Sequence, residues 1–273
     1  MLPLAGQPDQ VRDFWFSGAE INRYALEQAR YGDTHPGHAE LIFVTEPFLT
    51  GEQVKSDDPD APNAVDVLKL NALRTFNTGL YAYRTMRSTF RPVDVAAYPH
   101  ALKSTVSVQD WCGQVFQQIN RREDGWRYEL RSYFESDGDQ NRSLPDVWLE
   151  DELWLLVRLA PDQLPVDRFR AVPGALFTRF AHHEARAEEA VGRMEVGDGT
   201  SRYHITYPEL DRTLTLRFDT AFPHIIRGWT ERRPGGTTRA TLEDRVMNSN
   251  YWRHNAPADR AKRKDLGLAP IPD

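Results

Sequence analysis

The fold is decided by two neighbouring segments, VDVLKLNALRTF at residues 65–76 and LYAYRTMRSTF at residues 80–90. Apolar and polar side chains alternate along the first segment, so that one face carries Leu68, Leu70 and Ala72. A period of two places successive side chains on opposite faces of a strand. The turn residues Asn77, Thr78 and Gly79 separate the segments, and together they predict an antiparallel hairpin.

The second segment is polar on both faces. Tyr83, Thr85 and Arg87 share one face, while Arg84 and Met86 share the other. We expect one side of this sheet to border a partly polar cavity, although an edge strand would carry the same pattern.

Similar patterns recur along the chain. From residue 13 to 31 a strand is preferred, since Phe14, Trp15 and Phe16 suggest an aromatic strand, although Ile21, Ala25 and Gln28 recur near helical spacing and a helix over 19–30 is the alternative. Further strands are predicted at residues 39–45, 101–119, 126–134, 187–196, 202–207, 213–218, 225–232 and 237–247. One clear helix is predicted at about residues 143–160, with Ser143 as its N-cap and Pro161 as its end. The pattern indicates a mainly β protein, an antiparallel β-barrel or strongly curved half-barrel with one covering helix.

The chain divides into three predicted parts. Residues 1–12 are expected to be a flexible N-terminus, residues 13–247 a single barrel-like domain, and residues 248–273 a tail with one short helix at 258–265. A length of 273 residues is compatible with a single large β domain.

Composition excludes several classes of function. The 34 basic and 40 acidic residues give a formal charge of −6, so no nucleic-acid partner is predicted. No apolar run approaches the length of a membrane-spanning helix, so no integral membrane segment is expected. The single cysteine excludes an internal disulfide and a multi-cysteine zinc site.

The stretch from Val106 to Phe116 contains that cysteine. On a continuous strand, Asp110, Cys112 and Gln114 would share one face and Trp111 the other. A nucleophilic Cys112 would need a base or a cation nearby, and no histidine is close in sequence. We therefore expect Cys112 to be packed in a core, as free cysteines usually are.

Two segments could offer metal ligands. The first is His182-His183-Glu184 with Glu188 and Glu189, and the second is the acidic run at residues 135–141. Neither has the spacing of a zinc-protease helix or of a calcium-binding loop. A solvated loop and a hairpin turn are the favoured interpretations, so no metal and no cofactor are predicted. Phosphate loops and nucleophile elbows are also missing from the sequence.

Several short runs carry a resemblance to a known family. They are the residues at 14–15, 18–21, 28–32, 43–48, 68–71, 76–79, 109–113 and 132–135, within roughly residues 13–140. The chain resembles an uncharacterised family of bacterial envelope proteins, often lipoprotein-like, that sometimes bears the misleading label "septum formation inhibitor Maf". True Maf proteins have a Ser-x-Arg-Arg loop in an α/β fold, which this chain lacks. The fold looks similar to lipoprotein-carrier half-barrels, and the resemblance implies the envelope or periplasm; a complete N-terminus as given would instead imply the cytoplasm.

The leading hypothesis is a non-enzymatic binder or carrier of a lipid or other amphiphile, held between the sheet and the helix. The 30 aromatic residues on amphipathic strands, with polar groups among them, are typical of such a cavity. The candidate ligand-binding residues are Asp110, Trp111, Gln114, Tyr83, Arg84 and Trp126; no catalytic residue is assigned. The alternatives are a hydrolase-type enzyme around Asp110 and Cys112 with a distant histidine, and an assembly subunit without a ligand.

Overall fold

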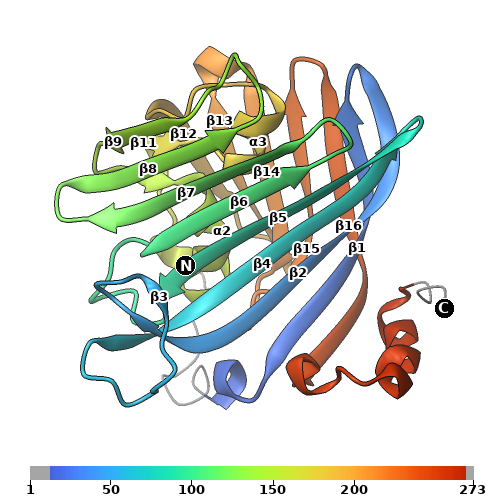
Figure 1. The fold of residues 1–273 in the computed structure, drawn as a ribbon. Coiled ribbons are helices and arrows are strands. Elements are labelled where there is room, and N and C mark those ends of the chain that lie inside the picture. The colour runs from blue at the N-terminus through green and yellow to red at the C-terminus, as the bar shows by residue number, and fades with distance from the viewer. Residues whose placement is uncertain (1–12, 269–273) are drawn as a thin grey trace.

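The computed structural model describes residues 13–268, and in it one large sheet curls around a helix (Figure 1). The strands are β1 (Ala19–Arg30), β2 (Asp33–Leu49), β3 (Val54–Lys55), β4 (Ala64–Thr78), β5 (Tyr81–Pro92), β6 (Lys103–Gln109), β7 (Gln114–Arg122), β8 (Gly125–Ser132), β9 (Gln140–Leu144), β10 (Trp148–Leu149), β11 (Asp167–Val172), β12 (Glu188–Glu195), β13 (Thr200–Tyr207), β14 (Arg212–Asp219), β15 (Ile226–Arg233) and β16 (Gly236–Ser249). The helices are α2 (Glu150–Leu159) and α3 (Ala175–Phe180), with 3-10 turns η1 (Pro161–Gln163), η2 (Pro208–Leu210), η3 (Tyr251–Arg253) and η4 (Pro257–Leu266).

The sheet is antiparallel throughout except where β10 pairs with β11. Its order runs from β10 through β11–β16 to β1, β2, β4 and on to β9, while β3 pairs only with β2. The edge strands β9 and β10 do not pair with each other, so the barrel stays open. The predicted mainly β, strongly curved architecture is confirmed.

The hairpin that decides the fold forms as predicted. β4 pairs with β5 from Val67↔Pro92 to Thr78↔Tyr81, around a turn at Gly79 and Leu80. The face of β4 that carries Leu68 and Leu70 is buried. The face of β5 that carries Tyr83, Thr85 and Arg87 is buried as well, so the expected partly polar interior is confirmed.

The central stretch is a hairpin and not the single strand predicted at 101–119. β6 ends at Gln109 and β7 begins at Gln114. An Asp110 carboxylate oxygen accepts hydrogen bonds from the backbone N–H groups of Cys112 (2.6 Å) and Gly113 (3.2 Å). An aspartate that bonds to the backbone two residues ahead favours a turn, and this local bond outweighs the apolar alternation.

Cys112 is exposed at the tip of this hairpin, so the prediction of a packed thiol was wrong. The glycine beside it has a packing role. A Cβ atom on Gly113 would lie 2.6 Å from the ring of Tyr133. The aromatic ring that lies over this backbone therefore comes from the loop after β8.

The predicted helix is present, but it is shorter and lies inside the sheet. Residues before Glu150 form β9 and β10, so Ser143 is in a strand and is not the N-cap. The Glu152 carboxylate accepts a hydrogen bond from the backbone N–H of Leu149 at 3.0 Å and caps the helix from within. The helix ends before Pro161, as predicted. All ten of its residues are buried, so α2 fills the barrel and does not cover it from outside.

Other local predictions differ from the structure. Residues 13–16 are helical and not an aromatic strand, and neither β11 nor α3 was predicted. The tail turn η4 agrees with the expected helix at 258–265. The predicted flexible segment 1–12 lies outside the described residues, and the division into one domain with a tail stays a prediction.

Candidate functional site

The inside of the sheet is charged where α2 begins. Three consecutive acidic residues, Glu150, Asp151 and Glu152, open the helix, and each is almost completely buried. Neighbouring residues on a helix point about 100° apart. Glu150 reaches an arginine of β14, whereas Asp151 and Glu152 reach two different arginines of β5. A buried charge is costly unless it is paired, and each carboxylate has an arginine partner.

Glu150 pairs with Arg212 of β14, which also bonds to Glu231 of β15 at 2.7 Å. Burial on its own would lower the pKa of Arg212, but the two carboxylates raise it well above its ordinary value. The same guanidinium holds the pKa of Glu231 below its usual range, against the opposing effect of burial. This triad joins α2 to two adjacent strands.

The other two acids bind the arginines of β5. Asp151 contacts Arg87 at 2.9 Å, and burial raises the pKa of Asp151 despite this partner. Glu152 contacts Arg91 at 2.6 Å and the His100 ring at 2.9 Å. Burial favours the neutral form of Glu152, yet His100 and Arg91 lower its pKa overall.

A fourth arginine secures the other half of the helix. Arg158 makes two parallel bonds to Glu20 of β1, at 2.8 and 2.7 Å, and both side chains are at most 1% exposed. The guanidinium also lies 4.4 Å from the ring centre of Phe43. Together these pairs tie α2 to both halves of the sheet.

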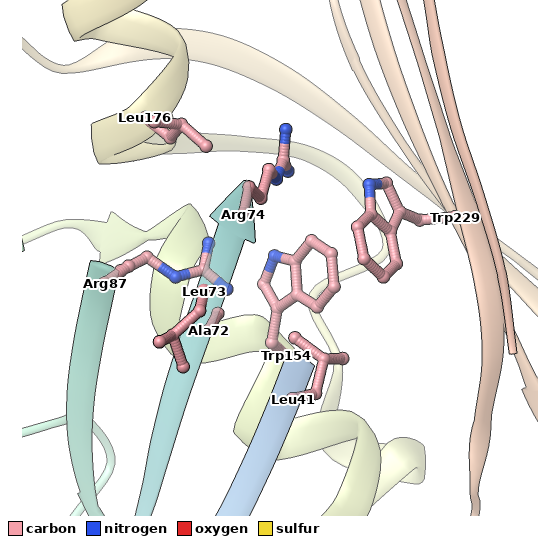
Figure 2. A pocket seen from close by; sticks show the side chains of 8 residues that line it. All are labelled: Leu41, Ala72, Leu73, Arg74, Arg87, Trp154, Leu176 and Trp229. Atoms are coloured by element: carbon pink, nitrogen blue, oxygen red, sulfur yellow. The ribbon is translucent and has the colours of Figure 1, made fainter. Parts of the chain in front are cut away.

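A small inner cavity lies between α2, α3 and the sheet (Figure 2). Its volume is about 10 Å³, and its lining consists of Leu41, Ala72, Leu73, Arg74, Arg87, Trp154, Leu176 and Trp229. A volume of this size is close to the minimum for a single water molecule. This inner cavity is therefore too small for an acyl chain.

A larger and more open pocket lies at one end of the barrel. We call it the entrance pocket; its volume is about 450 Å³, and it is lined by Arg30, Tyr31, Gly32, Phe177, Phe180, Ala181, His183, Leu210, Arg233, Pro234 and Gly235. These residues come from the β1–β2 turn, α3 with the residues that follow it, η2 and the β15–β16 turn. Antiparallel pairing brings both turns to the same end of the sheet, next to α3.

Two arginines give the entrance pocket its charge. Among residues 13–268, no carboxylate lies within 4.0 Å of Arg30 or Arg233. Arg30 donates to the Phe180 carbonyl at 2.5 Å and lies 4.4 Å from the ring centre of Tyr31. Within residues 13–268, the one hydrogen bond of the Arg233 side chain goes to the adjacent Pro234 carbonyl, at 3.4 Å. Burial lowers the pKa of Arg233; the Glu231 carboxylate, at a longer range than an ion pair, opposes this shift, and the charge of Arg30 adds to it.

The predicted site residues do not form one site. Asp110, Trp111 and Gln114 lie at or beside the β6–β7 turn, and Trp111 is 71% exposed. Arg84 is exposed on the outer face of β5. Trp126 is buried, and its indole donates to the Val147 carbonyl at 2.8 Å.

Of that set, Tyr83 contacts residues that line the entrance pocket, although it does not line the pocket itself. Its hydroxyl lies 2.6 Å from that of Tyr31 and accepts from Arg30 at 3.3 Å. Its ring packs edge-on against Phe180. Sequence reasoning missed Arg30 and Arg233, although each lies just before turn-forming residues, Gly32 in one case and Pro234, Gly235 and Gly236 in the other.

The metal candidates are engaged in ion pairs. His183 contacts Glu188 at 3.2 Å, and His182 contacts Asp137 at 3.5 Å. In the described part of the chain, no three His, Cys, Asp or Glu side chains gather as a metal site. None of the helices within residues 13–268 is long and apolar enough to cross a membrane.

Fold and site together define a helix-filled, open β-barrel-like protein. No family model and no curated protein matches the sequence. One similar solved structure is the crystal structure of a β-barrel-like protein, a domain of unknown function (DUF1849) from Brucella abortus, with 9% sequence identity and a TM-score of 0.48. The match covers 86% of this chain and 99% of that one. The resemblance to the bacterial envelope family and to lipoprotein carriers stays a prediction.

Proposed function

We propose that the protein binds a small amphiphile with an anionic head group in the entrance pocket. The observation that carries this proposal is the pair Arg30 and Arg233 in the lining of the pocket. Neither guanidinium has a carboxylate within 4.0 Å among the described residues, and apolar side chains of α3 line the same pocket. Guanidinium groups bind carboxylate or phosphate oxygens through two parallel hydrogen bonds.

The remaining lining suits the other end of such a ligand. Phe177, Phe180 and Leu210 provide apolar surface, and a volume of about 450 Å³ lies within the usual range for small-molecule sites. Because the inner cavity is so small, we expect a short or bent apolar tail that stays within the entrance pocket. This replaces the initial hypothesis of a chain lying along α2.

The proposal is tested by calorimetric titration of the full chain with dodecanoate and, in parallel, with dodecanol. Dodecanoate should bind more tightly, since only it can pair with the arginines. Arg233→Gln should weaken dodecanoate binding by about 10- to 100-fold, the value of one hydrogen bond to a charged group, and should leave dodecanol unaffected. Arg84→Gln, on the outer face, is the matched control. Equal affinity of the wild type for the two compounds would refute the proposal, as would an unchanged affinity of Arg233→Gln for dodecanoate.

The alternative of a cysteine hydrolase has less support. A nucleophilic thiol needs a base within hydrogen-bond reach. None of the described histidines hydrogen-bonds to Cys112, and the Asp110 carboxylate is occupied by the turn backbone.

On the family resemblance alone, we also propose the bacterial envelope as the location of the protein. Its recovery from the soluble cytoplasmic fraction of the cells that produce it would contradict this.

A further inference from the structure

The inner cavity beside α2 is surrounded by hydrogen-bond donors. Its polar side chains are Arg74, Arg87, Trp154 and Trp229, and all four are at most 9% exposed. The buried Nε1 atoms of both tryptophans and the Nε atom of Arg87 have no hydrogen-bond acceptor among the described residues. A buried donor without an acceptor costs about 1–3 kcal/mol. Three such groups lining one cavity therefore require an explanation.

The geometry brings these donors together. The Arg87 guanidinium lies 4.8 Å from the ring centre of Trp154, and that of Arg74 lies 5.4 Å from the ring of Trp229. The two indole rings pack edge to face with their centres 5.2 Å apart. Figure 2 shows the indole nitrogen of Trp154 on the side of its ring that faces the two arginines.

The two arginines beside the cavity differ in their partners. Arg87 has the Asp151 carboxylate at 2.9 Å, but Arg74 has no carboxylate within 4.0 Å in the part of the chain that the structure describes. Its one hydrogen bond to a side chain goes to the Gln28 amide oxygen, at 3.0 Å. Burial lowers the pKa of Arg74 to about 10, so the group remains a cation at neutral pH. A buried cation of this kind favours a nearby anion.

The chemistry of the lining selects the occupant. Indole N–H and guanidinium groups only donate, and the other lining side chains, Leu41, Ala72, Leu73 and Leu176, offer no acceptor. A water molecule here would find donors for its lone pairs but no side-chain acceptor for its own hydrogens. A monatomic anion accepts from every side. At about 10 Å³, the cavity admits at most one small particle and is too small for a carboxylate or a phosphate; a halide, which is somewhat larger than water, would fill it completely.

We infer that the inner cavity binds one halide ion, chloride in ordinary solution, held by Arg74, Trp154 and Trp229. This site is separate from the entrance pocket and does not depend on the proposed amphiphile. The ion would satisfy both indole donors and would add a counter-charge beside Arg74, whose side chain donates to Gln28 and whose interaction with the Glu231 carboxylate is at longer range. It would thereby fix α2 against β4 and β15.

Thermal unfolding of the full chain tests the site, in sodium chloride and in sodium gluconate at equal ionic strength. A ligand that binds only the folded state raises stability with the logarithm of its concentration. The unfolding temperature should therefore rise with chloride and should not rise with gluconate, which is too large for the cavity. Trp154→Phe removes one donor and should weaken chloride binding at least tenfold. The unfolding temperature of this variant should then begin to rise only at correspondingly higher chloride concentrations. Trp252 lies in the tail and is 50% exposed, so Trp252→Phe is the matched control. Its unfolding temperature should rise with chloride as in the wild type.

A crystal grown in bromide gives a second readout that does not rely on stability. An anomalous bromide peak between Arg74 and the two indoles is expected, and Trp154→Phe should abolish or weaken it. Identical responses to chloride and gluconate would overturn the inference. So would an unchanged chloride response in Trp154→Phe, or a cavity without bromide in crystals that bind bromide elsewhere.

Discussion

The ion pair of Glu20 with Arg158 offers the sharpest test of how α2 is held inside the barrel. Two parallel hydrogen bonds of 2.8 and 2.7 Å join the side chains, and neither is more than 1% exposed. Glu20→Gln keeps the shape and the size of the side chain but leaves the guanidinium without its counter-charge. Breaking a buried pair from one side costs about 3–5 kcal/mol.

The molecule contains a control pair with the same geometry and a different environment. Asp219 and Arg227 also form two parallel bonds, of 2.7 and 2.8 Å, but their side chains are 24% and 45% exposed. Exposed pairs contribute about 0–1 kcal/mol. We therefore expect Asp219→Asn to cost less than about 1 kcal/mol, several times less than Glu20→Gln.

Urea unfolding followed by tryptophan fluorescence measures both variants, with the slope of each transition checked for two-state behaviour. Burial opposes ionisation of Glu20, but Arg158 outweighs it and the folded-state pKa lies below 4.5. The stabilisation by the Glu20–Arg158 pair should therefore be present above pH 4.5 and be lost as the pH falls below it. The difference in the free energy of unfolding between wild type and Glu20→Gln should then narrow at low pH. If Glu20→Gln costs no more than Asp219→Asn at pH 7, burial is not what gives this pair its strength. The double variant Glu20→Leu with Arg158→Met should recover much of the loss, because it removes both buried charges.

Two further predictions concern single groups. Burial raises the pKa of Glu40 to about 7, so folding favours its neutral form, and stability should fall as pH rises from 4.5 through 7. Glu40→Gln should remove this decline in the free energy of unfolding, which amounts to up to about 3 kcal/mol. If the urea midpoints of wild type and Glu40→Gln fall equally as the pH rises, the prediction is wrong. The Cys112 thiol is exposed at a hairpin tip, so one equivalent should react with Ellman's reagent in the native protein; a reaction that requires denaturant would show that the thiol is covered.

The alternating segments and their turns determined the architecture without any tertiary information. Strands at residues 65–76 and 80–90, their hairpin, and the polar inward face of β5 all follow from a period of two between turn residues. Pro161 set the end of α2 correctly, since proline removes a backbone donor and clashes with the preceding turn. These features depend on neighbours in sequence, which is why they could be predicted.

The tertiary structure alone decided where the charges lie. The acidic start of α2 is typical of a solvated helix end, and only the surrounding strands make Glu150, Asp151 and Glu152 buried partners of three arginines. Likewise, Arg30 and Arg233 are far apart in sequence and meet because antiparallel pairing brings their turns to one end of the sheet. Local patterns fix which residues form strands, but the long-range pairing of β16 with β1 and the curl of the open sheet decide which polar groups share an interior. For that reason the barrel could be predicted from the sequence, whereas the inner cavity and the entrance pocket could not.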